Sequence, residues 1–160
     1  MPVSTDILES YVRPRQVFRR KLEGGTDEGR ALATLIGACL LIFVAQWPGL
    51  VRAAHVDPAV PLDARMGGAL FGTLFLLPPI AYGVAALSHL LARALGGTGS
   101  FFAARLALFW ALLAVSPLML LQGLVRGFIG PGPALTLVGL VVSAAFLALW
   151  VTSLLESERR

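Results

Sequence analysis

Four long stretches of the chain contain no Asp, Glu, Lys or Arg, and they dominate its pattern of apolar and polar residues. They hold 21, 27, 20 and 29 residues. Their charged borders are Arg30 and Arg52, Arg65 and Arg93, Arg105 and Arg126, and Arg126 and Glu156. A helix of roughly 20 residues crosses the hydrocarbon core of a bilayer. Each stretch is therefore long enough to form one membrane-spanning helix.

These stretches predict helices, because a chain in lipid must pair its backbone polar groups internally. A transmembrane barrel would need short segments in which apolar and polar residues alternate. The runs LLIFVA (40–45) and LFLLPPIA (74–81) do not alternate. We therefore predict an all-α, polytopic transmembrane helical bundle with about four spans, which lie at residues 31–51, 66–92, 106–125 and 134–155.

Three prolines near the middle of these spans predict kinks: Pro78 and Pro79 in the second span, and Pro117 in the third. Proline lacks a backbone N–H and clashes with the carbonyl four residues earlier. We expect Ser116 to bond a carbonyl that Pro117 leaves free. The Pro78-Pro79 pair could also break the second stretch and give five membrane segments, an alternative that the sequence leaves open.

Residues 1–30 predict a basic, cytoplasmic, amphipathic leader that precedes the first span. Asp6 and Glu9 resemble a helix-capping box, and apolar residues follow at helical spacing. Five cations lie within nine residues: Arg13, Arg15, Arg19, Arg20 and Lys21. A helix of this kind can lie at the membrane surface and contact anionic lipid headgroups. We expect this interfacial position, and the alternative is a short helix packed on the bundle.

The cations of the chain are distributed unequally between the two sides of a four-span bundle. Residues 1–30 carry six, the loop 93–105 carries two and the tail 156–160 carries two, which makes ten on the side of both termini. The other side carries three, Arg52, Arg65 and Arg126. Because loops rich in Lys and Arg stay in the cytoplasm, we predict that both termini are cytoplasmic.

Composition excludes several classes of protein. Hydrophobic residues make up 57% of the chain and charged residues 14%, against roughly 25% charged in soluble domains. The net charge of +4 comes from basic residues that flank the apolar stretches, so we expect no nucleic-acid partner. The single cysteine, Cys39, excludes an intrachain disulfide.

The sequence predicts no catalytic residue, no cofactor and no metal site. The run GGTG (96–99) lacks the Lys and Ser or Thr of a phosphate-binding loop. No Asp or Glu lies within a span, and Ser116 has no evident general base. His89 is the one histidine within a span, and the sequence leaves open whether it has a functional role.

Pairs of small residues predict close contacts between helices. Gly68 with Gly72, and Gly123 with Gly127, form GxxxG motifs. Without Cβ atoms at these positions, two helix backbones can approach each other closely. These four glycines are therefore our candidates for helix packing in the bundle.

Three segments resemble the bacterial branch of the Yip-type (Ypt-interacting protein) membrane domain family: VRPRQVFRRKLEG (12–24), QWPGLVR (46–52) and GGTGSFFAARLALFWALLAVSPL (96–118). The resemblance implies a cytoplasmic leader and several spans. Eukaryotic members associate with small GTPases, but they have five spans and tyrosine-glycine leader motifs, which this chain lacks. We therefore do not expect GTPase binding. The composition, rich in Ala, Gly and Arg, suggests a bacterial inner membrane.

We expect a non-enzymatic integral membrane protein that organises the membrane or acts as a scaffold or interaction protein. Its partners would be the bilayer with its anionic headgroups, and a second copy or another membrane protein. One alternative is a small oligomeric transporter or channel, which needs a continuous polar face built from Gln46, Ser88, His89, Ser116 and Gln122. Another is an accessory subunit of a larger membrane complex.

Overall fold

The computed structural model describes residues 2–159, and helices account for most of them. Two short helices, α1 (Val3–Ser10) and α2 (Pro14–Glu23), precede the bundle. The bundle consists of α3 (Glu28–Val56), α4 (Leu62–Phe71), the π-helical turn η1 (Gly72–Leu76), α5 (Leu77–Ala94), α6 (Phe101–Phe128) and α7 (Pro133–Ser157). None of the described residues forms a strand, so the prediction of an all-α protein is confirmed.

Four helical segments are long and apolar enough to cross a membrane. They are α3 with 29 residues, the continuous segment Leu62–Ala94 with 33, α6 with 28 and α7 with 25. At a rise of 1.5 Å per residue each of them exceeds a hydrocarbon core of about 30 Å. The predicted polytopic transmembrane bundle of about four spans is thereby confirmed. Each helix also extends beyond its charge-free stretch, and α3 continues through Pro48 to Val56.

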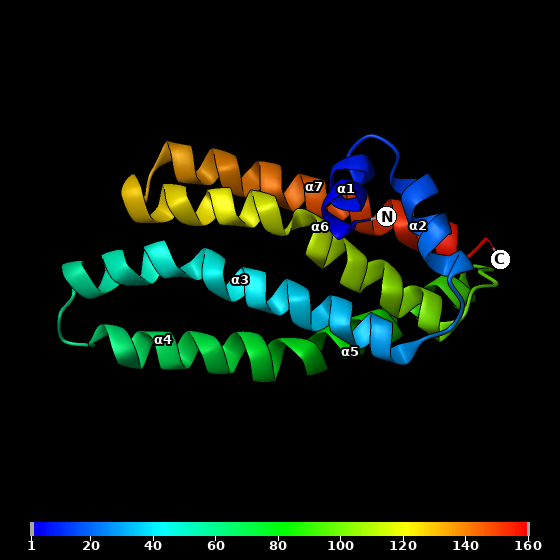
Figure 1. Cartoon of the computed structure of the whole chain (residues 1–160), viewed down its shortest axis with the longest axis horizontal. Coiled ribbons are helices and arrows are strands. Elements are labelled where there is room, and N and C mark those ends of the chain that lie inside the picture. Colours follow the sequence, from blue (N-terminus) through cyan, green and yellow to red (C-terminus); the bar gives the residue numbers. More distant parts are fainter. Residues whose placement is uncertain (1, 160) are drawn as a thin grey trace.

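The four long segments run side by side, and the N- and C-terminal parts of the chain lie at the same end of the bundle (Figure 1). We call this the terminal end. The turns at residues 57–61 and 129–132 lie at the opposite end, which we call the loop end. An even number of spans brings the two ends of the chain to one side of the membrane.

Helix α6 is the centre of the bundle. It packs against α3, α5 and α7, whereas α4 contacts mainly α3 and the turn η1. Its buried side chains form much of the apolar core, among them Leu106, Phe109, Trp110 and Leu113. Because α5 and α7 both pack on α6, the width of α6 holds these two helices apart at the terminal end.

The prolines do not divide the second or the third span. Leu62–Ala94 is one continuous helical segment, so the alternative with five membrane segments is not realised. The turn η1 lies directly before Pro78 and Pro79, whose missing N–H groups leave carbonyls four residues earlier without their usual partners. Helix α6 continues through Pro117 and changes direction along its length (Figure 1).

Ser116 compensates for Pro117 as predicted. Its hydroxyl donates a hydrogen bond of 2.6 Å to the carbonyl of Leu113, the group that the N–H of residue 117 would otherwise bind. The Ser116 side chain is fully buried, with 0% exposure. An unpaired carbonyl in this environment would be costly, so the contact explains why a serine lies beside the proline.

Of the four glycines predicted to pack, the structure brings two against another helix. A Cβ added at Gly123 would lie 2.8 Å from the carbonyl carbon of Ala45, and one at Gly127 would lie 2.8 Å from the carbonyl oxygen of Pro48. A Cβ at Gly68 or Gly72 would have no neighbour within 4 Å. Within residues 2–159 no close helix contact is therefore formed at Gly68 on α4 or at Gly72, the first residue of η1.

Two helix starts are capped by side chains. Asp27 accepts a hydrogen bond from the backbone N–H of Arg30 at 3.2 Å, and Ser100 accepts one from the N–H of Ala103 at 3.1 Å. These contacts satisfy backbone donors that have no partner within the helix. Asp6 was predicted as a cap but lies inside α1, which begins at Val3, and its carboxylate binds cations of α2 instead.

Candidate functional site

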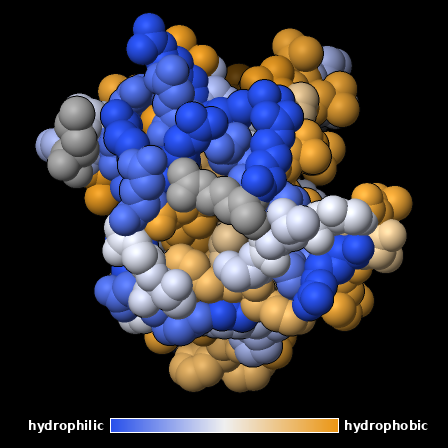
Figure 2. Space-filling model, turned by 90° about the vertical axis from the view of Figure 1, so that its right-hand side faces the viewer, coloured by the Kyte–Doolittle hydropathy of each residue, from blue (hydrophilic) through white to orange (hydrophobic). Residues whose placement is uncertain are grey.

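The two short helices α1 and α2 cover the terminal end of the bundle, and we call them the leader cap. They contact α6 and α7, and the side chains of Val17 and Phe18 are fully buried in the apolar core. Hydrophilic residues cover much of this end, and hydrophobic residues surround them (Figure 2). The leader is therefore packed on the bundle through Val17 and Phe18, whereas Leu8 and Val12 are 71% and 79% exposed. Its position at the membrane surface stays a prediction.

A buried carboxylate holds the leader cap together. Asp6 on α1 is 4% exposed, and its oxygens lie 2.6 Å from the ammonium of Lys21 and 3.1 Å from the guanidinium of Arg20. The Lys21 ammonium also lies 4.4 Å from the centre of the Trp110 ring, a cation–π contact with α6. The Trp110 indole donates to the hydroxyl of Ser10 at 3.1 Å. These contacts join α1, α2 and α6.

A second ion pair joins the leader cap to α7. Arg19 lies 2.9 Å from a carboxylate oxygen of Glu156, whose side chain is 4% exposed. Arg20 also binds Glu9 at 2.6 Å, and hydrogen bonding to Glu9 raises the pKa of Arg20. The sequence did not reveal the contact of Glu156 with Arg19 or that of Glu9 with Arg20, because in each case the two residues lie on different helices.

The five cations predicted at the lipid interface thus fall into two groups. Arg19, Arg20 and Lys21 bind carboxylates of this chain. Arg13 and Arg15 are exposed and form no ion pair with any residue from 2 to 159. Of these five cations, Arg13 and Arg15 are the two without an ion pair to residues 2–159.

His89 joins α5 to the C-terminal end of the chain. Its ring is 1% exposed, its Nδ1 lies 3.1 Å from Glu158, and its centre lies 4.1 Å from the ring centre of Phe101. The other oxygen of Glu158 accepts a hydrogen bond from the N–H of Gly99 at 3.0 Å. Within residues 2–159 no group of three potential metal ligands includes this histidine. The sequence did not reveal the contact, since His89 and Glu158 lie 69 positions apart.

Replacing Glu158 with Ala is expected to loosen the loop between α5 and α6. The substitution removes the acceptor of the Gly99 N–H, a hydrogen bond that contributes about 1 kcal/mol in this partly exposed loop. Hydrogen exchange followed by mass spectrometry should show about fivefold faster exchange at residues 97–100. Arg159→Ala is the control, and equal acceleration in both variants would contradict the assigned contact.

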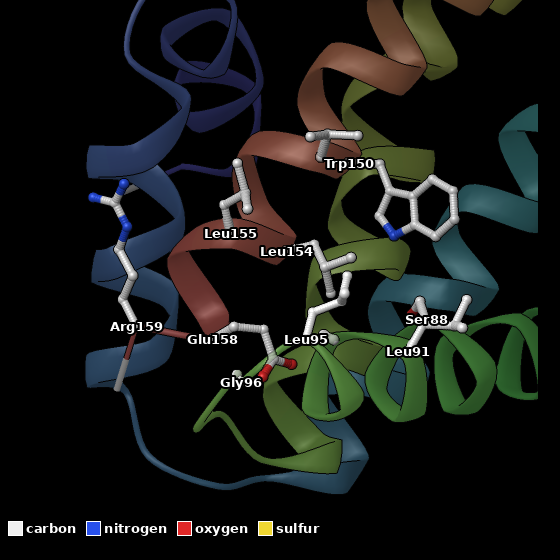
Figure 3. Close-up of a pocket in the computed structure, with 12 residues that line it drawn as sticks. Ser88, Leu91, Leu95, Gly96, Trp150, Leu154, Leu155, Glu158 and Arg159 are labelled. Carbon is white, nitrogen blue, oxygen red and sulfur yellow. The ribbon is translucent and has the colours of Figure 1, made fainter.

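An apolar cleft lies between α5 and α7 beside the leader cap. It has a volume of about 530 Å³, and Figure 3 shows its walls, which include Leu91 from α5, Leu95 directly after α5, and Leu154 and Leu155 from α7. The polar residues Glu158 and Arg159 lie at its terminal end. We call it the α5–α7 cleft. The walls are accessible from outside, since Leu91 is 67% and Leu155 50% exposed.

One polar atom in the wall of this cleft has no partner. The Nε1 atom of Trp150 is buried but donates no hydrogen bond to any residue from 2 to 159. Its indole nitrogen points toward the α5 side of the cleft, where Ser88 and Leu91 lie (Figure 3). Buried donors in folded proteins are nearly always paired, and this N–H is an exception within residues 2–159.

The polar residues that a channel would need bind separate local partners. The amide of Gln46 donates a hydrogen bond to Thr73 at 2.8 Å. The amide of Gln122 lies close to Gly139 on α7, where an added Cβ would be 3.3 Å from its nitrogen. The remaining residues of the predicted face are Ser88, which binds Ala85, His89, which binds Glu158, and Ser116, which binds Leu113. Gln46 and Gln122 line one small cavity together with Arg126, whereas Ser88, His89 and Ser116 each bind a group of this chain elsewhere in the bundle.

Comparison with known proteins identifies the family of this fold. A profile of the Yip1 domain matches residues 8–157, which run from α1 to the end of α7. Neither the curated proteins nor the solved structures give a significant match. The family resemblance seen in the sequence is confirmed over nearly the whole chain, and the bacterial branch stays a prediction.

Proposed function

The chain belongs to the Yip1 domain family, and we propose that it is a non-enzymatic scaffold that binds another membrane protein through the α5–α7 cleft. We place it in the bacterial inner membrane with both termini in the cytoplasm. The unpaired cations Arg13 and Arg15 on the leader cap would then face the anionic cytoplasmic leaflet. The single observation that carries the proposal is the open apolar cleft beside a leader cap whose own charges are largely paired.

The dimensions of the cleft favour a transmembrane helix as its occupant. Helices α5 and α7 both pack on α6, and an apolar cleft of about 530 Å³ lies between them. The occupant that we propose would pack on their apolar side chains as helices generally do, at interaxial distances of about 8–10 Å. The cleft opens sideways among apolar side chains, which an occupant reaches from within the bilayer. A Ser or Thr hydroxyl or a free carbonyl on that helix would accept the unpaired N–H of Trp150.

The other polar contacts at the terminal end support a structural role rather than catalysis. Glu156 binds Arg19 and Glu158 binds His89, so each carboxylate already joins two elements of the fold. The hydroxyls of Ser88 and Ser116 each donate a hydrogen bond to a backbone carbonyl of their own helix. A rigid terminal end is what a scaffold requires, because a preorganised surface loses less conformational entropy when it binds.

Photo-crosslinking in native membranes tests the proposal. A photoreactive amino acid at Leu91 or Leu155, on opposite walls of the cleft, is expected to yield a covalent product with one other membrane protein. The same amino acid at Leu140 is the control, because Leu140 is 64% exposed on α7 but does not line the cleft. Equal products at all three positions, or none at the cleft positions, would refute the proposal. A crosslinked product of twice the mass of the chain would mean that the occupant of the cleft is a second copy of this protein.

A further inference from the structure

A separate groove lies at the loop end, between the last turns of α3 and α6. It has a volume of about 630 Å³. Its lining residues are Trp47, Pro48, Val51, Arg52, His55, Leu124, Gly127 and Phe128. We call it the loop-end groove, and it shares no residue with the α5–α7 cleft.

The two walls of the groove are stripes of large side chains. Trp47, Val51 and His55 follow one another at intervals of four residues along α3, and Leu124 and Phe128 do so along α6. Residues at this spacing lie on one face of a helix. Trp47 is 43%, Val51 53% and Phe128 81% exposed, so these walls have no covering element in the chain.

The floor of the groove is the close contact between α3 and α6. Gly127 lies against Pro48 without room for a Cβ, which brings the two helices together beneath the walls. The groove is therefore shallow and elongated. Its α3 wall rises about 12 Å from Trp47 to His55, at 1.5 Å per residue.

Arg52 supplies a cation at the outer part of the groove. One guanidinium nitrogen donates to the carbonyl of Gly127 at 3.3 Å, which holds the side chain over the groove. Arg52 forms no ion pair with any residue from 2 to 159, whereas the nearby Arg65 binds Asp57 at 3.2 Å. The guanidinium group has five N–H donors, so donors remain for an anion, and His55 lies one turn farther out.

This order of chemistry along the groove matches a membrane lipid. We propose that the loop-end groove binds one glycerophospholipid, with an acyl chain along Trp47, Val51 and Leu124 and its phosphate on Arg52. The apolar walls extend toward the middle of the span, and the cation lies nearer the membrane surface. A lipid in the bilayer has the same order, with its acyl chain toward the middle and its phosphate at the surface. A guanidinium binds phosphate oxygens in a bidentate manner. The proposal concerns a site at the other end of the bundle and does not depend on the proposed scaffold function.

Native mass spectrometry of the purified protein in a mild nonionic detergent tests the lipid site. The protein is loaded with phosphatidylglycerol, and the lipid-bound fraction is measured. We expect one retained lipid, and we expect Arg52→Gln to lower its affinity by about tenfold. Arg126→Gln is the matched control, because Arg126 lies against Gly49 at the loop end, outside the groove and without an ion pair, and it should keep wild-type binding.

A second variant separates binding from folding. Leu124→Trp fills the groove and leaves Arg52 in place, and it should lower lipid retention as well, while its melting temperature stays close to that of the wild type. Unchanged retention in both Arg52→Gln and Leu124→Trp would overturn the proposal, as would an equal loss in Arg126→Gln. Displacement of the lipid by millimolar inorganic phosphate would also overturn it, because the site would then recognise the phosphate without the chain.

Discussion

Replacing Gly123 with Val is expected to separate α6 from α3 and to lower the free energy of unfolding by about 3 kcal/mol. The new Cβ would lie 2.8 Å from the carbonyl carbon of Ala45 and closer still to its oxygen. A flexible side chain could rotate away from such a clash, but here the obstacle is helix backbone. The change therefore acts on the contact between α3 and α6, which carries much of the packing of the bundle.

Gly68→Val is the matched control for this experiment. It introduces the same side chain into a helix of a predicted span, where a Cβ meets no neighbour within 4 Å. Both variants change helix propensity equally, so the difference between them measures the packing clash. Unfolding in mixed micelles with increasing SDS provides the free energies. Equal destabilisation by the two substitutions would mean that the contact between Gly123 and Ala45 is not the cause.

Replacing Asp6 with Asn is expected to release the leader cap from the bundle. The change leaves Lys21 and Arg20 without their shared carboxylate, and breaking a buried pair costs about 3–5 kcal/mol. We expect a loss below that range, because the side chains of Lys21 and Arg20 are 22% and 40% exposed and solvent screens their interaction with Asp6. Limited proteolysis with trypsin reports the release, since cleavage after residues 19 and 20 becomes possible when α2 leaves α7.

Glu9→Gln is the control for the leader cap. Glu9 binds Arg20 as well, but its side chain is 31% exposed, and a pair of this kind contributes about 0–1 kcal/mol. The proteolysis rate of this variant should stay near that of the wild type. If Asp6→Asn leaves the rate unchanged too, then the apolar burial of Val17 and Phe18 alone holds the leader cap in place.

Properties that depend on neighbouring residues were predictable from the sequence. Each span is a continuous apolar stretch, and the cost of an unpaired backbone in lipid makes it helical whatever the other spans do. The hydrogen bond of Ser116 is equally local, because its acceptor, Leu113, lies one turn away on the same helix. The charged residues at the borders of the stretches predicted the ends of the spans only approximately, because a helix can continue beyond the apolar region.

The sequence did not predict how the leader is placed. An amphipathic basic helix satisfies its apolar side equally well in the headgroup layer or against a bundle, and its pattern is the same in both cases. The outcome depends on whether the bundle offers a complementary surface. Here Trp110 and Glu156 offer one, and both belong to helices more than 80 positions away in the chain.

The helical nature of the apolar stretches and their order were thus set by the sequence alone, because the bilayer acts on each apolar stretch separately. Only the structure decided that the second stretch stays one continuous segment, Leu62–Ala94. Only the tertiary structure decided which surfaces of those helices are buried. The two GxxxG motifs look the same in the sequence, yet a Cβ added at Gly123 would clash with α3, whereas one added at Gly68 would have no neighbour within 4 Å. The contact of His89 with Glu158 and the position of Trp150 beside the α5–α7 cleft were likewise decided by the tertiary structure. Rotation of a helix about its axis depends on packing against its neighbours, and no local pattern in an apolar helix determines that angle.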